Sequence, residues 1–441
     1  MGTEMVLMPK QQKPSMRWIL LPCFILALSL LPVPLQAQQT EIPAVSEDPP
    51  AEGSRIVAHR PPLYFIKRVV HPVSWLEGGI FPVLRLAERL GGNVSGDTKK
   101  EPRESGIKFG AKGLGGSTGF GPMIKPYHNN LFNTGIRAEA SAVVTYKMYQ
   151  AFGARADFPL VSGQDSGVDI GILGGYLSRP SDSFYGLGNN TPATNESRFR
   201  TVSRTVGAGL KMRLSKSSSA GVESGFRSIG VTEPRTGKPM AVVFQDENVP
   251  GQMTGATMNV STAFLERNTK DHPSWAESGG LQRVEATLAE GQRGGDYSYW
   301  RYRLELQQFL PLTEDHRKVI ALRADVETNR DKGGSVVPFF DMATIGGSST
   351  VRGFRTNRFT DKSALTLSAE YRYRIWRYFD WGFFLDAGQV APEIGDFAMD
   401  NFHTGYGVSF FARSEKRRGV IIDLARSREA WMVYLDFSPL F

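Results

Sequence analysis

The sequence predicts an all-β fold, a transmembrane antiparallel β-barrel of about sixteen strands with one long loop folded inward and a short N-terminal periplasmic segment. Three observations predict it. Short segments of alternating apolar and polar residues follow one another from residue 106 to residue 441. An apolar segment with basic residues before it, near the N-terminus, is typical of an export signal. After residue 37, no apolar run approaches the ~20 residues that a spanning helix needs.

Residues 1–37 are predicted to be a cleavable signal peptide. Basic residues precede the apolar core Trp18–Leu31, and Ala37 supplies a small residue before the expected cleavage. The chain's 1 cysteine, Cys23, lies in that core. The mature chain would then contain no cysteine, which excludes disulfides and thiolate metal sites.

Residues 38–105 are predicted to be a linker with one short helix. Glu41–Gly53 is rich in Pro, Ala and Glu, as mobile linkers are. Pro82–Leu90 is loosely amphipathic and predicts a short helix that lies on a membrane surface or caps the barrel mouth, with a short plug or packed linker as the alternative. The barrel domain is expected over residues 106–441.

Alternation bounded by turn signals predicts about sixteen strands in this domain. An even count keeps both ends of the barrel on the periplasmic side. The predicted strands are Ile107–Leu114, Gly119–Tyr127, Ile136–Tyr146, Tyr149–Phe158, Val168–Ser178, Phe199–Leu214, Ala220–Ile229, Met258–Arg267, Leu281–Glu290, Tyr297–Leu310, Val319–Thr328, Ser363–Trp376, Trp381–Gln389, Phe402–Arg413, Gly419–Arg426 and Trp431–Leu440.

Two of these strands show most clearly which side chains each face carries. Ser363–Trp376 places apolar side chains such as Leu367 on one face and Glu370 on the other. Trp381–Gln389 does the same with Leu385 and Asp386. Because the sequence predicts no helices to cover such apolar faces, lipid is the expected environment, with a soluble two-sheet barrel as the alternative.

The last strand has a distinctive pattern. Trp431, Phe437 and the terminal Phe441 share one face. A terminal phenylalanine on an alternating strand resembles the signal by which barrel proteins are handed to the outer-membrane insertion machinery. Glycines interrupt Ile107–Leu114, and Pro439 removes a donor from the closing strand, so the seam between the first and last strands is expected to open.

Several motifs in order resemble the BamA/TamA superfamily, in its bacterial surface antigen type. Ile345–Arg355 resembles that family's conserved loop, and Ala369–Arg372 and Phe384–Gly388 resemble its two following strands. Phe184–Asn189 resembles an extracellular-loop motif of the same family, and Asn130–Gly135 resembles an early turn with Asn in place of one Gly. The resemblance spans residues 106–441.

The resemblance implies that the long loop, Asn329–Lys362, folds into the barrel and that Arg352 pairs there with Glu370 and Asp386. A guanidinium presents a planar fork of donors that matches carboxylates, and glycines let the loop backbone approach the wall. The implied loop motif comprises Gly346, Gly347, Val351, Gly353 and Phe354.

The resemblance also implies a non-enzymatic role in the insertion, assembly or translocation of proteins, or of lipids, at the outer membrane. Expected partners are outer-membrane lipids, the insertion machinery, client outer-membrane proteins and a periplasmic partner bearing POTRA modules. Because residues 38–105 contain no POTRA pattern, the chain resembles the POTRA-less branch. A passive channel and a surface-exposed structural antigen remain alternatives, the latter suggested by the long loop Gly230–Gly255.

No catalytic residue, cofactor or metal site is predicted. Gly115–Gly119 satisfies G-x-S-x-G, but its neighbours are predicted strands, so a hairpin turn is the better interpretation. The 6 histidines are scattered without metal-ligand spacing. The net charge of +8 suits a basic lumen or anionic headgroups, and no basic cluster accompanies a nucleic-acid motif, so nucleic acid is not an expected partner.

Overall fold

The computed structural model describes residues 104–113, 118–163, 165–245, 249–252, 254–273, 275–292, 297–376, 378–413 and 419–436. The predicted signal peptide, the predicted short helix and most of the G-x-S-x-G motif lie outside these residues. Contacts divide the chain into Met1–Arg85 and Leu86–Phe441, and the fold described below is that of the second unit. No helix in the described residues is long and apolar enough to cross a membrane.

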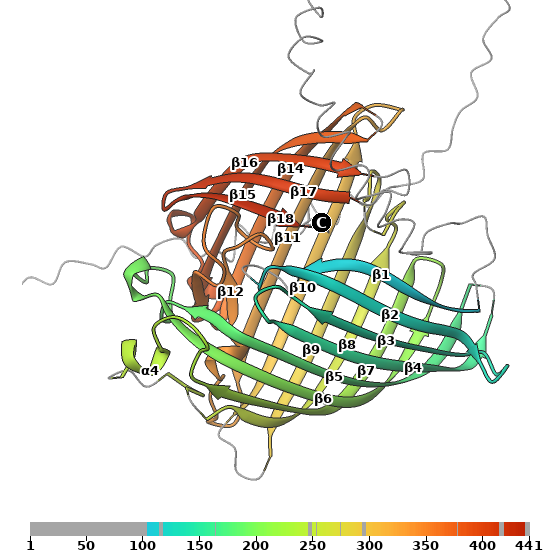
Figure 1. Cartoon of the computed structure of the whole chain (residues 1–441), viewed down its shortest axis with the longest axis horizontal. Coiled ribbons are helices and arrows are strands. Elements are labelled where there is room, and N and C mark those ends of the chain that lie inside the picture. The colour runs from blue at the N-terminus through green and yellow to red at the C-terminus, as the bar shows by residue number, and fades with distance from the viewer. Residues whose placement is uncertain are drawn as a thin grey trace, which may run out of the picture. The chain divides into compact units, whose positions relative to one another are not determined.

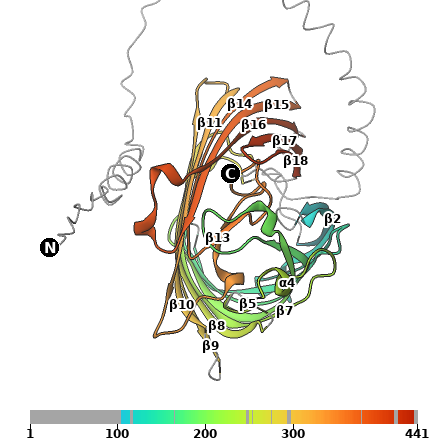
Figure 2. The ribbon, with the colours of Figure 1, turned by 90° about the vertical axis from the view of Figure 1, so that its left-hand side faces the viewer.

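A single 16-stranded antiparallel sheet forms a nearly closed barrel, and strands that follow each other in sequence pair with each other (Figures 1 and 2). The predicted all-β barrel is confirmed, and each predicted strand has its counterpart. The barrel strands are β1 (Ser105–Gly113), β2 (Phe120–Leu131), β3 (Ile136–Val144), β4 (Gln150–Ser162), β5 (Gly167–Phe184), β6 (Ser197–Arg213), β7 (Ser218–Thr232), β8 (Ala256–Asn268), β9 (Gly279–Gly291), β10 (Ser298–Pro311), β11 (Lys318–Asp331), β14 (Ser363–Trp376), β15 (Phe379–Ala391), β16 (His403–Arg413), β17 (Gly419–Ser427) and β18 (Trp431–Asp436).

Alternation along each strand separates an outer from an inner face. On β14 and β15, Leu367 and Leu385 are 41% and 56% exposed, whereas Glu370 and Asp386 are 2% and 0% exposed. The apolar side chains therefore point outward and the acids point into the lumen, as the sequence predicted. Such an outward apolar face is the surface that a membrane barrel presents to lipid.

The two ends of the barrel differ in the length of their connections. Strand β1 begins at one end, and the 16 strands return the chain to that end, so β1 starts and β18 finishes on the same side. Connections there include the tight turns 132–135 and 214–217, and we call this the short-turn end. The opposite, long-loop end carries 185–196, 233–255, 332–362 and 392–402. In bacterial outer-membrane barrels, short turns face the periplasm and long loops face the exterior.

Several connections contain short elements of their own. The loop 332–362 carries a two-stranded hairpin whose strands pair in antiparallel register. An apolar cluster that includes Ile345, Val351, Phe354 and Phe359 packs it against the inner wall. The short elements are α4 (Met240–Val243), β12 (Ala343–Ile345), β13 (Phe359–Asp361) and the 3-10 turns η2 (Ala193–Asn195), η3 (Phe339–Asp341), η4 (Ile394–Asp396) and η5 (Met399–Asn401).

Strands β1 and β18 are the two edges of the sheet (Figure 1). Within the described residues, β1 pairs only with β2 and β18 only with β17. Outward side chains on both edges, such as Phe109 and Val433, are 41% and 69% exposed. The predicted seam is therefore unpaired along its described length. Pro439 lies outside the described residues.

Candidate functional site

The centre of the candidate site is Arg352, which the loop 332–362 carries into the barrel. Arg352 Nε donates to Asp386 Oδ2 at 2.7 Å, and Nη2 donates to Asp386 Oδ1 at 3.0 Å. Arg352 Nη1 donates to Glu370 Oε2 at 3.0 Å. The side chains of Arg352 and Glu370 are each 2% exposed and that of Asp386 is 0% exposed. The structure thus brings together the three residues that the sequence singled out, in the bidentate geometry that suits a guanidinium.

Asp423 and Ser409, which sequence reasoning missed, complete the site together with the ring of Phe384. Asp423 on β17 accepts from Arg352 Nη1 at 3.4 Å, and Ser409 Oγ donates to Asp423 at 2.6 Å. The guanidinium carbon of Arg352 lies 3.4 Å from the centre of the Phe384 ring, which adds a cation–π contact. The alternation along Gly419–Arg426 is a signal that could have placed Asp423 on the inner face, but nothing in the sequence indicated which residue it meets.

Burial and the neighbouring charges shift the pKa of Arg352 in opposite directions. Burial by itself lowers the pKa of the guanidinium, but the carboxylates of Asp386, Glu370 and Asp423 outweigh it and raise the pKa above its ordinary value. Arg352 is therefore permanently charged. Glu370 also accepts from Arg372 Nε at 2.6 Å, so two arginines share three acids in this cluster.

The backbone of the loop reaches the wall because of its glycines. Gly346, Gly347 and Gly353 have φ of 110°, 95° and 93°, in the left-handed region that other residues rarely adopt. A Cβ on Gly353 would lie 2.9 Å from the backbone of Arg426, on β17. On the wall side, a Cβ on Gly405 would lie 1.8 Å from the carbonyl oxygen of Arg352. The close approach therefore requires glycine both on the loop and on the wall.

The same loop is tied to the closing strand. The Gly353 N–H donates to Tyr434 Oη at 3.1 Å, and the Tyr434 hydroxyl donates to the Phe354 carbonyl at 2.8 Å. Ser427 Oγ, at the end of β17, donates to the Gly353 carbonyl at 2.6 Å. Because Tyr434 lies on β18, the site is joined directly to one side of the seam. Sequence reasoning did not identify Tyr434, which shares the inner face of the closing strand with Asp436.

A second buried arginine, Arg358, joins the inward loop to two other connections at the long-loop end of the barrel. Arg358 Nε donates to Glu429 Oε2 at 2.9 Å, and its Nη1 donates to Thr191 Oγ1 at 3.0 Å. Its guanidinium also lies over the rings of Tyr185 and Phe359. Tyr185 belongs to the Phe184–Asn189 motif, which the structure therefore places against the inward loop.

The connection 269–278 also folds into the barrel, although it lies at the short-turn end. Trp275 is 5% exposed, and its ring packs edge-on against Phe411 at 4.6 Å between centroids. The guanidinium of Arg372 lies 4.8 Å from the Trp275 ring, and Arg374 forms an ion pair with Glu277. Since Arg372 also binds Glu370, a continuous row of contacts runs from the long-loop end to the short-turn end.

Replacing Trp275 with Ala is expected to lower the free energy of unfolding by about 3–5 kcal/mol, because a buried aromatic ring is lost. Reversible urea unfolding in lipid vesicles, followed by far-ultraviolet circular dichroism, measures the change. Trp376→Ala is the matched control, since Trp376 is 47% exposed at the same end of the barrel. Equal losses for the two variants would show that Trp275 has no special packing role.

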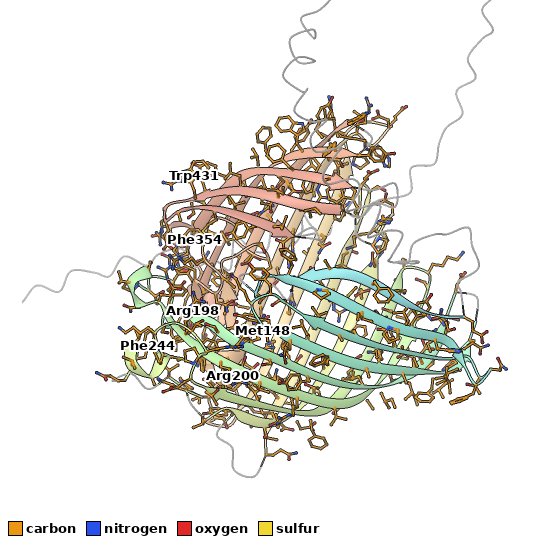
Figure 3. All side chains as sticks on the ribbon, viewed as in Figure 1. Met148, Arg198, Arg200, Phe244, Phe354 and Trp431 are labelled. Carbon is orange, nitrogen blue, oxygen red and sulfur yellow. The ribbon has the colours of Figure 1, made fainter. Side chains whose placement is uncertain are left out.

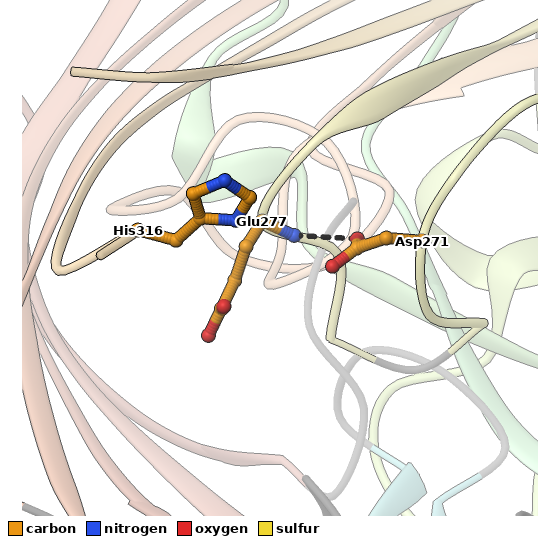
Figure 4. A group of neighbouring side chains, drawn as sticks. All are labelled: Asp271, Glu277 and His316. Carbon is orange, nitrogen blue, oxygen red and sulfur yellow. Dashed lines mark hydrogen bonds between the residues drawn. The ribbon is translucent and has the colours of Figure 1, made fainter. Parts of the chain in front are cut away.

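Asp271, Glu277 and His316 form a cluster at the short-turn end (Figure 4). Their nearest possible ligand atoms lie within 4.8 Å of one another. However, Glu277 is paired with Arg374, and Asp271 Oδ1 accepts the backbone N–H of Glu277 at 2.9 Å. Both acids of the cluster therefore already have partners within the described residues.

Of the predicted C-terminal assembly signal, the structure describes Trp431. Its side chain is 63% exposed, on the outward face of β18, with the Arg426 guanidinium 5.5 Å from its ring. Figure 3 shows it at the edge of the sheet. Phe437 and Phe441 lie outside the described residues, so their part in the signal stays a prediction.

Comparison with known proteins agrees with this architecture. Residues 130–414, more than half of the chain, match the Omp85 superfamily domain. The fold is similar to that of BamA from Haemophilus ducreyi lacking POTRA domains 1–3, with 13% sequence identity and a TM-score of 0.57 over 76% of this chain and 71% of that one.

Two further solved structures are similar. They are CdiB from Acinetobacter baumannii (10% identity, TM-score 0.46, 76% of this chain and 65% of that one) and CdiB from Escherichia coli (13%, 0.47, 79% and 68%). The predicted resemblance is confirmed at the level of the family. The chain is an outer-membrane β-barrel that belongs to the Omp85 superfamily.

Proposed function

We propose that this barrel inserts or translocates proteins at the outer membrane, without enzymatic chemistry, by transient opening of the seam between β1 and β18. The observation that carries the proposal is the position of the buried Arg352 cluster. It binds β14, β15 and β17 through Glu370, Asp386 and Asp423, and the same loop binds β18 through Tyr434. A lock at this place would hold one side of the seam in shape while the other side moves.

The unpaired edges would supply the working surface. An edge strand presents a row of free N–H and C=O groups that can pair with another strand. In a membrane such groups are costly unless they are paired, so an incoming strand of a client barrel would be stabilised there. The proposed partners are client outer-membrane proteins, the insertion machinery and a POTRA-bearing periplasmic protein.

Welding the seam tests the proposal. The double variant Phe109→Cys with Val433→Cys places one thiol on the outward face of each edge. It is one of a series of double variants that pair neighbouring outward positions of β1 and β18. Oxidised full-length protein in vesicles is expected to insert a small outer-membrane barrel protein about tenfold or more slowly than reduced protein, because an edge held by a covalent bond cannot open. Folding of the added barrel, read from its heat-modifiable mobility, measures the rate.

A weld inside the sheet is the matched control. Val222 and Ala263 are register partners on β7 and β8, and both lie on the outer face. Val222→Cys with Ala263→Cys should leave insertion unchanged. Full activity of every oxidised seam pair would exclude an opening seam.

A passive channel remains the second candidate, and one observation favours it. A polar cavity of about 360 Å³ lies beside the inward loop, lined by charged side chains that include Arg301, Arg303, Arg323 and Asp325. Conductance in planar bilayers, with and without residues Ser348–Arg355, discriminates between the two functions. A plain channel does not depend on the loop motif. The surface-antigen alternative stays a prediction.

A further inference from the structure

Two arginines lie on the outer, lipid-facing wall of the barrel. Along β6, Arg200 and Arg204 are exposed on the same face as Val206 and Leu210, which are 61% and 37% exposed. Figure 3 labels Arg200. Arg204 pairs in register with Ser228 on β7. An outward position on a membrane strand is normally apolar, so these charges require a physical account.

Their height on the barrel provides the first part of that account. Strand β6 begins at the long-loop end, and Arg200 and Arg204 lie in its first half. The next outward position toward the short-turn end is Val206, whose register partner Phe226 is 54% exposed. Arginine on a lipid face costs ~2–4 kcal/mol at the midplane but only ~0–1 near the interface. The two arginines therefore lie at the headgroup level of the outer leaflet.

Neither arginine has an anionic partner among the described residues. Within the described part of the chain, Arg200 and Arg204 form no ion pair or side-chain hydrogen bond, although they lie on a barrel rich in ion pairs. Glu290, on the outer face of β9, is already paired with Lys332 at 2.5 Å. Glu233, which follows the register partner of Arg200, pairs with neither of them. As far as the described residues go, two positive charges therefore remain without a partner.

Hydroxyl groups surround the second arginine. A polar depression of about 420 Å³ is lined by Arg204, Ser228, Thr254, Thr257 and the backbone at Gly230. The Thr257 hydroxyl donates to Ser228 Oγ at 3.3 Å, which leaves the Ser228 hydroxyl free to donate outward. A Cβ placed on Gly230 would meet no atom within 4 Å, so the floor of the depression is open. Guanidinium and hydroxyl donors together match the oxygens of a phosphate.

We propose that Arg200, Arg204, Ser228, Thr254 and Thr257 form a binding site, the phosphate patch, for the phosphorylated headgroup of an outer-leaflet glycolipid. The charge of the patch is complementary to such a headgroup, and the apolar wall below it accommodates the acyl chains. The site lies on the outer face of β6 to β8, far along the sheet from both edges of the seam. It does not depend on the proposed insertion activity.

The test uses the full chain in nanodiscs and bis-phosphorylated lipid A as the probe. Native mass spectrometry is expected to show that Arg200→Gln with Arg204→Gln weakens lipid A binding about tenfold or more, because charge-assisted hydrogen bonds to phosphate are lost. Dephosphorylated lipid A is expected to bind the unchanged protein as weakly as lipid A binds the double variant. Identical heat-modifiable mobility of all variants establishes that they are folded.

Arg267→Gln is the matched control. Arg267 is also exposed on the outer face, but at the short-turn end of β8, in the other leaflet. This variant is expected to bind lipid A as the unchanged protein does. An equal loss in Arg267→Gln, an unchanged affinity in the double variant, or full displacement of lipid A by millimolar inorganic phosphate would each overturn the proposal.

Discussion

Replacing Arg352 with Ala is expected to release the inward loop and to abolish the proposed insertion activity. The change leaves Glu370, Asp386 and Asp423 buried without their shared partner. Breaking a buried ion pair on one side typically costs about 3–5 kcal/mol, because the remaining charge is uncompensated. Urea unfolding in vesicles measures this loss. Trypsin cleavage within residues 332–362 reports the released loop.

Two variants control for this result. Arg355→Ala removes an arginine of the same loop whose side chain is 59% exposed and pairs with Glu196, so its effect should stay below about 1 kcal/mol. Arg352→Lys keeps the charge but loses the fork that binds Asp386 through two donors, so it should be intermediate. If Arg352→Ala resists trypsin as the unchanged protein does, Arg352 does not hold the loop.

Adding one methyl group to Gly405 is expected to have a similar effect from the wall that holds Arg352, because Gly405 on β16 pairs in register with Asp386 on β15. The new Cβ would lie 1.8 Å from the Arg352 carbonyl oxygen, which is backbone and cannot rotate away. Overpacking of this kind costs about 1–3 kcal/mol, and here it also displaces Arg352 from its carboxylates. Gly405→Ala should therefore expose the loop to trypsin and slow insertion.

A control variant and a double variant test whether the changes at Gly405 and Arg352 act through the same contact. Gly395→Ala is the control, because a Cβ there meets no atom within 4 Å. If both changes act by unseating Arg352, the double variant Arg352→Ala with Gly405→Ala should cost less than the sum of the two single changes. Strict additivity would show that Gly405 acts independently of the arginine.

The barrel could be predicted because each strand is determined by residues that lie close together in the sequence. Period-two alternation decides which side chains face lipid, and tight turns decide where each strand ends. Glu370 and Asp386 were assigned to the inner face on that basis alone. The pairing of Arg352 with them was implied by the family resemblance, because no local pattern connects a loop residue to strands that follow it.

The remaining contacts could not be predicted because they join inner faces that are distant in sequence. Asp423 meets Arg352 across 71 positions, and Tyr434 meets Gly353 across 81. Trp275 enters the barrel from a connection whose sequence resembles an ordinary exposed turn. In each case the curvature of the sheet decides which residue lies opposite. Neither strand propensity nor the alternation of apolar and polar residues predicts that curvature.

The hydrogen bond between Gly353 and Tyr434 has a mechanical consequence. The contacts of the loop to Glu370, Asp386, Asp423, Ser427 and Tyr434 all fall on strands β14 to β18, so this edge is expected to stay fixed in the proposed opening. Strand β1 is held only by its hydrogen bonds to β2 among the described residues, so it is the edge that we expect to move. Because Arg358 also joins this loop to Thr191 and Tyr185, between β5 and β6, we expect the proposed opening to move the strands that precede β5 and to leave the loop in place.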